Sequence, residues 1–180
     1  MWYPATVTTP PATEPVTLDD VKRQVYVDHD DDNDLIERLI AAARDHVERY
    51  CGAMFASQTV TIKCDEFGDF SYLPVAPVSS ISSIEYDAIG GTAVTLPTSV
   101  YELRSDGIES RIVLKYGQQW PPIQPGSRIT VTAVVGHDDV PPAVKHAMLL
   151  YIANAFENRE NAADGGWTTM DSLLCNFRRG

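Results

Sequence analysis

The stretch 140-VPPAVKHAMLLYIANAFENR-159 decides how the rest of the chain must fold. It predicts one helix, because prolines suit a first helical turn and the apolar residues that follow recur at helical spacing. These apolar residues surround nearly the whole circumference, and a helix of that kind is buried on more than one side. We therefore expect Met148, Ile152 and Phe156 in the core of the protomer, with Leu149 on the opposite face of the helix.

A second helix is predicted from Asp34 to Tyr50, and it is the natural partner for the first. Leu35, Leu39 and Val47 lie on one face at helical spacing, and Gly52 follows where a left-handed residue commonly ends a helix. Each buried Leu or Ile on such a face contributes about 1.5–3 kcal/mol. We expect these three apolar residues in the core.

The acidic run 28-DHDDDND-34 precedes this helix and has two interpretations. Its alternating aspartates match the first ligand positions of an EF-hand calcium loop, but Asn33 and Leu39 occupy the positions that require Gly and Glu. Aspartates also cap free N–H groups at a helix N-terminus and complement the helix dipole. We favour the capping interpretation and predict no metal site.

Between the helical stretches, residues 57–135 change to the period-two pattern that is typical of strands. Short strands separated by turns in this region predict an antiparallel sheet. The predicted strands are 59–64, 81–86, 94–96, 100–103, 112–116 and 127–135.

The remaining segments complete an α+β fold class. Residues 1–16 contain four prolines and predict an extended N-terminal arm, Thr17 is placed to cap a helix that ends near Val27, and Met170 to Phe177 predicts a short terminal helix. The predicted organisation is a helical core, made of 17–56 and 136–180, that carries 57–135 as a β insertion. We expect the arm and the loop at 161–169 to be mobile in the free protein.

Composition excludes several classes of protein. The 180 residues carry a net charge of −11 with a pI near 4.6, which opposes tight binding to nucleic acid. The three scattered cysteines indicate free thiols in a reducing compartment. No signal peptide is visible, and the longest apolar run is too short to span a bilayer. We expect no membrane association.

No catalytic constellation is present in the sequence, so we predict no enzyme activity, no catalytic residue and no cofactor. His137 and Asp138 are able to pair a base with a carboxylate, but they also suit a capping loop. Another alternative is a carbohydrate- or protein-binding module that uses the β region with an exposed Trp120 and Tyr116.

Several motifs in one order resemble the head–tail connector, or adaptor, proteins of tailed bacteriophages and gene transfer agents. The resemblance spans nearly the whole chain, including the β insertion that longer members carry. The motifs are 10-PPATEPVTLDDVK-22, 27-VDHDDD-32 continuing into Leu35-Ile36 and 41-AAAR-44, 120-WPP-122, 140-VPPAV-144 through 157-ENRE-160, and 172-SLL-174 with 177-FRR-179.

This resemblance implies a structural role in the virion, at the head–tail junction of particles assembled in the bacterial host cytoplasm. Such adaptors form a ring, generally of twelve subunits, beneath the portal protein. The ring joins the portal to a stopper or tail-completion protein and surrounds a channel through which genomic DNA passes without specific binding.

The resemblance also implies which residues make contacts. The family's C-terminal segment docks on the portal, which points to Leu173, Leu174, Phe177, Arg178 and Arg179. In a ring, the face of the 140–159 helix that carries Leu149 is the expected subunit interface.

Overall fold

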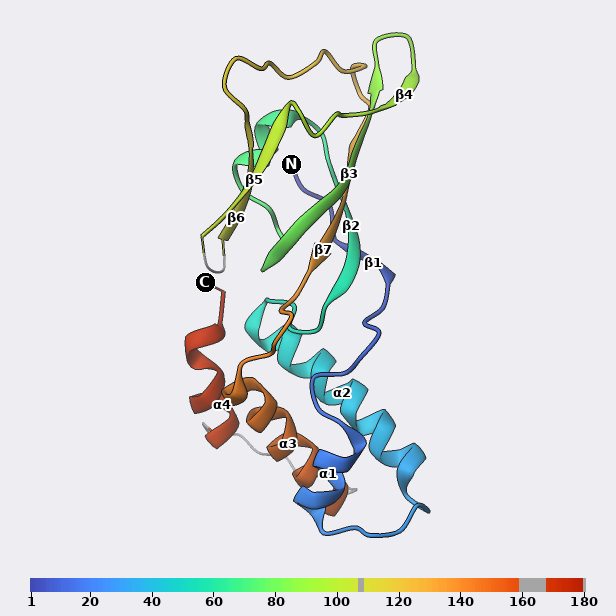
Figure 1. Ribbon diagram of the computed structural model, residues 1–180, viewed down its shortest axis with the longest axis vertical. Helices are drawn as coiled ribbons and strands as arrows, with labels where there is room; N and C mark the ends of the chain where they lie inside the picture. Colours follow the sequence, from blue (N-terminus) through green and yellow to red (C-terminus); the bar gives the residue numbers. More distant parts are fainter. Residues whose placement is uncertain (107–108, 159–167, 180) are drawn as a thin grey trace. The chain divides into compact units, whose positions relative to one another are not determined.

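The computed structural model describes residues 1–106, 109–158 and 168–179, and it shows an α+β fold with antiparallel sheets (Figure 1). In chain order the elements, with η for a 3-10 helix, are β1 (Thr6–Thr9), α1 (Leu18–Val25), α2 (Asn33–Cys51), β2 (Gln58–Cys64), η1 (Phe67–Ser71), β3 (Val78–Ala88), β4 (Thr92–Thr95), β5 (Tyr101–Asp106), β6 (Glu109–Leu114), β7 (Ile129–Val135), α3 (Pro142–Glu157), α4 (Thr169–Leu174) and η2 (Cys175–Phe177).

The chain divides into two compact units, and the polypeptide passes between them three times. The β unit contains Met1–Ala12 and Ser57–His137, and the helical unit contains Thr13–Ala56 and Asp138–Gly180. The predicted loop at 161–169 lies largely outside the described residues. No helix in the described ranges is both long and apolar enough to cross a membrane.

The β unit is built on a five-stranded antiparallel sheet in the order β1-β2-β7-β3-β4. Strands β2 and β7 pair along their whole length, with Val60 opposite Ala133 and Ile62 opposite Val131. All four of these side chains are fully buried, because alternate residues of a strand point to the same face. A separate hairpin, β5–β6, pairs Tyr101 with Leu114 at its base.

The prediction that residues 1–16 form only an extended arm is wrong for Thr6–Thr9, which are the edge strand β1. Thr6 pairs with Thr61 and Val7 with Val60, and the Tyr3 N–H donates to the Lys63 carbonyl at 2.9 Å. Proline density hid this strand in the sequence. The prolines only flank it, and Thr and Val favour strands at an open sheet edge.

The helical unit contains one apolar core, to which α1, α2, α3 and α4 all contribute buried residues. Val47 of α2 and Met148 and Ile152 of α3 are fully buried in it. Leu39 and Phe156 are half-buried and pack against the same core. The N-cap predicted at Thr17 is confirmed, since the Asp20 N–H donates to the Thr17 hydroxyl at 3.1 Å, and the Asp20 side chain completes a capping box.

The core face of α2 is rotated by about one residue from the predicted one. Ile36 and Ile40 are the buried residues, whereas Leu35 is half-exposed and is not part of the core cluster. The prediction for Leu35 is therefore corrected. Both 35/39 and 36/40 are apolar pairs at helical spacing, so periodicity alone did not determine which pair faces α3.

Candidate interaction surfaces

The C-terminal segment, defined here as residues 168–179, begins with a reciprocal cap. The Asp171 N–H donates to the Thr168 hydroxyl at 3.2 Å, and the Thr168 N–H donates to the Asp171 carboxylate at 2.8 Å. Thr168 and Asp171 thus satisfy N–H groups that a helix start otherwise leaves without partners. This local cap makes α4 a defined element despite its short length.

The same segment is bound to the end of α2. The Arg179 N–H donates to the Cys51 carbonyl at 2.7 Å, which satisfies one of the last carbonyls of the helix. The Phe177 ring stands edge-on to Phe55 with centroids 6.2 Å apart. The Arg178 guanidinium lies 5.1 Å from the centroid of the Tyr50 ring, within cation–π range.

A hydrogen bond links this segment to the face of α2. The Tyr50 hydroxyl bonds to the Asp171 carboxylate, and this bond raises the pKa of Tyr50 above its ordinary value. Hydrogen bonds from Thr168, followed by the one from Tyr50, lower the pKa of Asp171. The charged form of Asp171 therefore stabilises the docked segment.

The five residues that the resemblance assigned to portal contact differ in how deeply the structure buries them. Leu174 is fully buried in the core of the helical unit, so its side chain is not on the surface, and its assignment is corrected. Leu173, Phe177 and Arg179 are half-buried, and Arg178 is exposed. The two leucines are neighbours on a short amphipathic helix, and the one on its apolar face turns inward.

The outward face of α3 also differs from expectation. Leu149 is half-buried and packs against the core of its own protomer. Leu150 is half-buried and lies outside that core cluster, on the side of α3 that carries the exposed His146 and Asn154. The apolar residue that faces away from the core is therefore Leu150.

The acidic run before α2 only partly follows the capping prediction. Asp32 is the N-cap residue but makes no side-chain capping hydrogen bond. Asp30 accepts hydrogen bonds from Lys22 at 2.7 Å and from the Asn33 side chain at 3.2 Å, and the Lys22 bond lowers its pKa. Within the described residues, no three His, Cys, Asp or Glu side chains form a group that could hold a metal ion.

Tyr26, next to this run, was not identified from the sequence. It ends α1 in the left-handed conformation with φ 57°, and its side chain is 95% exposed. Glycine is the usual residue at such a position because a Cβ is unfavourable there. A strained, exposed aromatic side chain marks this corner of the helical unit as a candidate contact site.

A buried ionic network was also missed. Glu48 is 8% exposed, and one of its oxygens accepts hydrogen bonds from the Phe55 and Ala56 N–H groups at 2.8 and 3.1 Å. Arg44 bonds to the other Glu48 oxygen at 3.3 Å and to Glu14 at 2.8 Å. Burial lowers the pKa of Arg44, but the hydrogen bond to Glu14 and the two carboxylate charges outweigh it and raise that pKa. The spacing of Arg44 and Glu48 was the available signal.

The alternative of a binding module built on Trp120 is not supported by the geometry. Trp120 is half-buried and stacks on Phe67, with centroids 4.8 Å apart and planes at 3°, and it meets Phe70 edge-on. A ring occupied on its face by Phe67 does not offer that face to a sugar. Tyr116 is fully exposed, as predicted.

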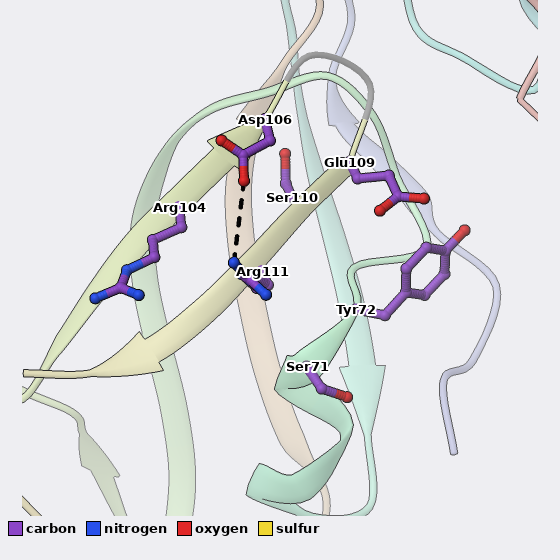
Figure 2. Close-up of a pocket in the computed structure, with 7 residues that line it drawn as sticks. All are labelled: Ser71, Tyr72, Arg104, Asp106, Glu109, Ser110 and Arg111. Carbon is purple, nitrogen blue, oxygen red and sulfur yellow. Dashed lines mark ion pairs between the residues drawn. The ribbon is translucent and has the colours of Figure 1, made fainter.

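A small pocket lies on the β5–β6 hairpin (Figure 2). Its volume is about 110 Å³, and among its lining residues Arg104 is the strand partner of Arg111, and Asp106 that of Glu109. Arg111 lies 4.0 Å from Asp106. The positive and negative charges balance, so the pocket has no net charge with which to select one ion.

Of the two residues that could pair a base with a carboxylate, His137 is half-buried and Asp138 is exposed.

Comparison with known proteins finds a match to one family model and several solved structures with the same fold. A model of the family described as phage gp6-like head-tail connector proteins matches residues 15–90. A search of curated protein sequences finds no match. The matched range includes α1 and α2 of the helical unit and β2, η1 and β3 of the β unit.

Solved structures extend the likeness to nearly the whole chain. A chain from the neck of an empty gene transfer agent (GTA) particle, computed with C6 symmetry, has a TM-score of 0.82 and 16% identity, covering 98% of this chain and 95% of that chain. A chain from the virion of a native GTA particle has a TM-score of 0.82 and 18% identity, covering 97% and 94%.

A third match comes from the neck of a native GTA particle computed with C12 symmetry, with a TM-score of 0.80, 17% identity and coverage of 98% and 95%. At these identities the structural matches show the shared fold. The resemblance to the head–tail connector proteins of tailed phages and gene transfer agents is thus confirmed, by the family signal over residues 15–90 and by the fold of nearly the whole chain.

Proposed function

We propose that the chain is a structural head–tail connector, which forms a ring beneath the portal and joins the capsid vertex to stopper or tail-completion proteins. The observation that carries this proposal is the connector-family signal on residues 15–90, combined with a fold shared along 98% of the chain with a protein of a GTA neck. Necks solved with C6 and C12 symmetry support a ring, with twelve subunits as the proposed number.

In this proposal the helical unit is the connector core, and its exposed and half-buried residues make the contacts. Leu173, Phe177, Arg178 and Arg179 form the proposed portal contact, while Leu174 holds their segment from inside the core. On α3, the subunit interface was expected at Leu149, and we now extend it to Leu150, which faces away from the core.

The proposed ring surrounds the DNA channel without specific binding. A net charge of −11 repels the phosphate backbone, which suits a channel through which DNA must slide. We propose no catalytic role and no cofactor, with localisation at the head–tail junction of a virion assembled in the host cytoplasm.

Deletion of the gene in the producing host tests this role. We expect DNA-filled heads and free tails to accumulate separately, and a copy of the gene supplied in trans to restore joined particles. Normal joined particles in the absence of the protein would show that it is not the connector.

A further inference from the structure

The sheet of the β unit ends in two short strands that are alike. β1 and β4 are its outermost strands, each has four residues, and their sequences are TVTT and TAVT. Neither contains a charge or a proline, the devices with which natural proteins usually protect an open sheet edge. Seven of the eight residues are exposed, and Val94 is half-buried.

Both edge strands run in the same direction. β1 is antiparallel to β2, and β2 is antiparallel to β7, so β1 runs parallel to β7. β4 reaches the same orientation through β3. A copy placed beside the sheet by rotation about a ring axis that runs roughly along the strands keeps its strand direction, so its β4 would meet β1 as a parallel pair. A two-fold axis perpendicular to the strands would instead pair β1 with β1, antiparallel.

Each edge also has one valine on the core face of the sheet. Val7 lies opposite the buried Val60, and Val94 lies opposite the buried Tyr86. Both valines are incompletely covered within the protomer, since Val7 is 47% exposed and Val94 is half-buried. Side by side, they would continue the apolar layer of one copy into the next.

The two edge strands are displaced from each other along the strand direction, and this displacement agrees with strands that are tilted relative to the axis of a ring. Through β2, β1 lies level with Thr132 to Val134 of β7, whereas β4 pairs with the part of β3 that extends from the level of Thr130 outward. This offset is roughly four or five residues, or about 15 Å along the strands. Across a sheet about 24 Å wide, it corresponds to a tilt of roughly 30°, close to that of closed barrels.

We propose that β1 of one copy pairs in parallel with β4 of the next copy, so that the sheets join around the ring, with Val7 beside Val94. This inference rests on the proposed ring. The occupant of each edge is a second copy of the chain, because one protomer supplies both complementary edges in matching direction and with matching apolar residues. In this register Thr6 lies beside Ala93, with both side chains on the other face of the sheet.

A double cysteine variant, Thr6→Cys with Ala93→Cys, tests the pairing in assembled necks purified with the portal. Cys175→Ser is included because Cys175 is exposed. Neighbouring residues of paired strands have Cα separations that a disulfide can bridge. After mild oxidation we expect a ladder of covalent oligomers up to the full ring on non-reducing gels.

Matched variants give the controls. Each single substitution should give no ladder, because every link needs both positions. Thr6→Cys with Thr92→Cys should also give none, because residue 92 points to the opposite face. Intact necks that give no ladder with the 6/93 pair would overturn the pairing and leave the connector role standing. Dimers from the Thr6→Cys variant alone would also overturn it, in favour of a two-fold contact. Failure of the unmodified protein to appear in any neck would reject both the connector role and the pairing.

Discussion

Replacing Glu48 with alanine should destabilise the helical unit more than any surface change on α2. The substitution removes the acceptor of the Phe55 and Ala56 N–H groups, which bond to it at 2.8 and 3.1 Å. Hydrogen bonds to a charged group contribute about 1.5–3 kcal/mol each, so we expect a loss of about 3 kcal/mol or more in the free energy of unfolding. The higher helix propensity of alanine offsets only a few tenths of that loss.

Urea denaturation followed by far-ultraviolet circular dichroism measures this loss. Glu37→Ala is the matched control, since Glu37 is an exposed glutamate on the same helix and should change stability by no more than about 0.5 kcal/mol. Glu48→Gln keeps one acceptor oxygen and should fall between the two. A loss below about 1 kcal/mol for Glu48→Ala would refute the assigned role of the network.

Three further outcomes are expected. At neutral pH a maleimide should label Cys175 rapidly and Cys51 and Cys64 only on unfolding, because burial raises the pKa of the latter two to about 11 and about 12; rapid labelling of three thiols would contradict the packing. Tyr26→Gly should raise the free energy of unfolding by about 0.5–1 kcal/mol by relieving the left-handed strain, and a loss in urea titrations would show that its side chain makes a stabilising contact. Because the pKa of Asp171 is lowered on folding, its contribution to the amide protection of the C-terminal segment should be fully present above the ordinary pKa of 3.8 and should decrease as the pH falls from there through the lowered pKa; protection that is unchanged at low pH would contradict this.

Local signals predicted the elements well. Thr17 caps α1 as predicted, Gly52 ends α2 in the left-handed conformation, and the β-branched alternation of residues 59–64 falls within β2. These features depend on neighbours in the chain, which a single sequence displays.

Contacts between residues that lie far apart in the sequence could not be predicted from it. Trp120 is covered because Phe67, far from it in the sequence, stacks on its face. Glu48 is buried because the chain turns back after α2 and aims two N–H groups at its carboxylate. Periodicity ranks the faces of a helix, but only the packing partner decides between Leu35 and Ile36.

Electron microscopy of the neck in assembled particles tests the connector role most directly. We predict a ring of copies of this fold between the portal and the tail-side proteins, with the C-terminal segment of each copy against the portal. Density for the neck that this fold does not fit, or placement of the protein elsewhere in the particle, would contradict it.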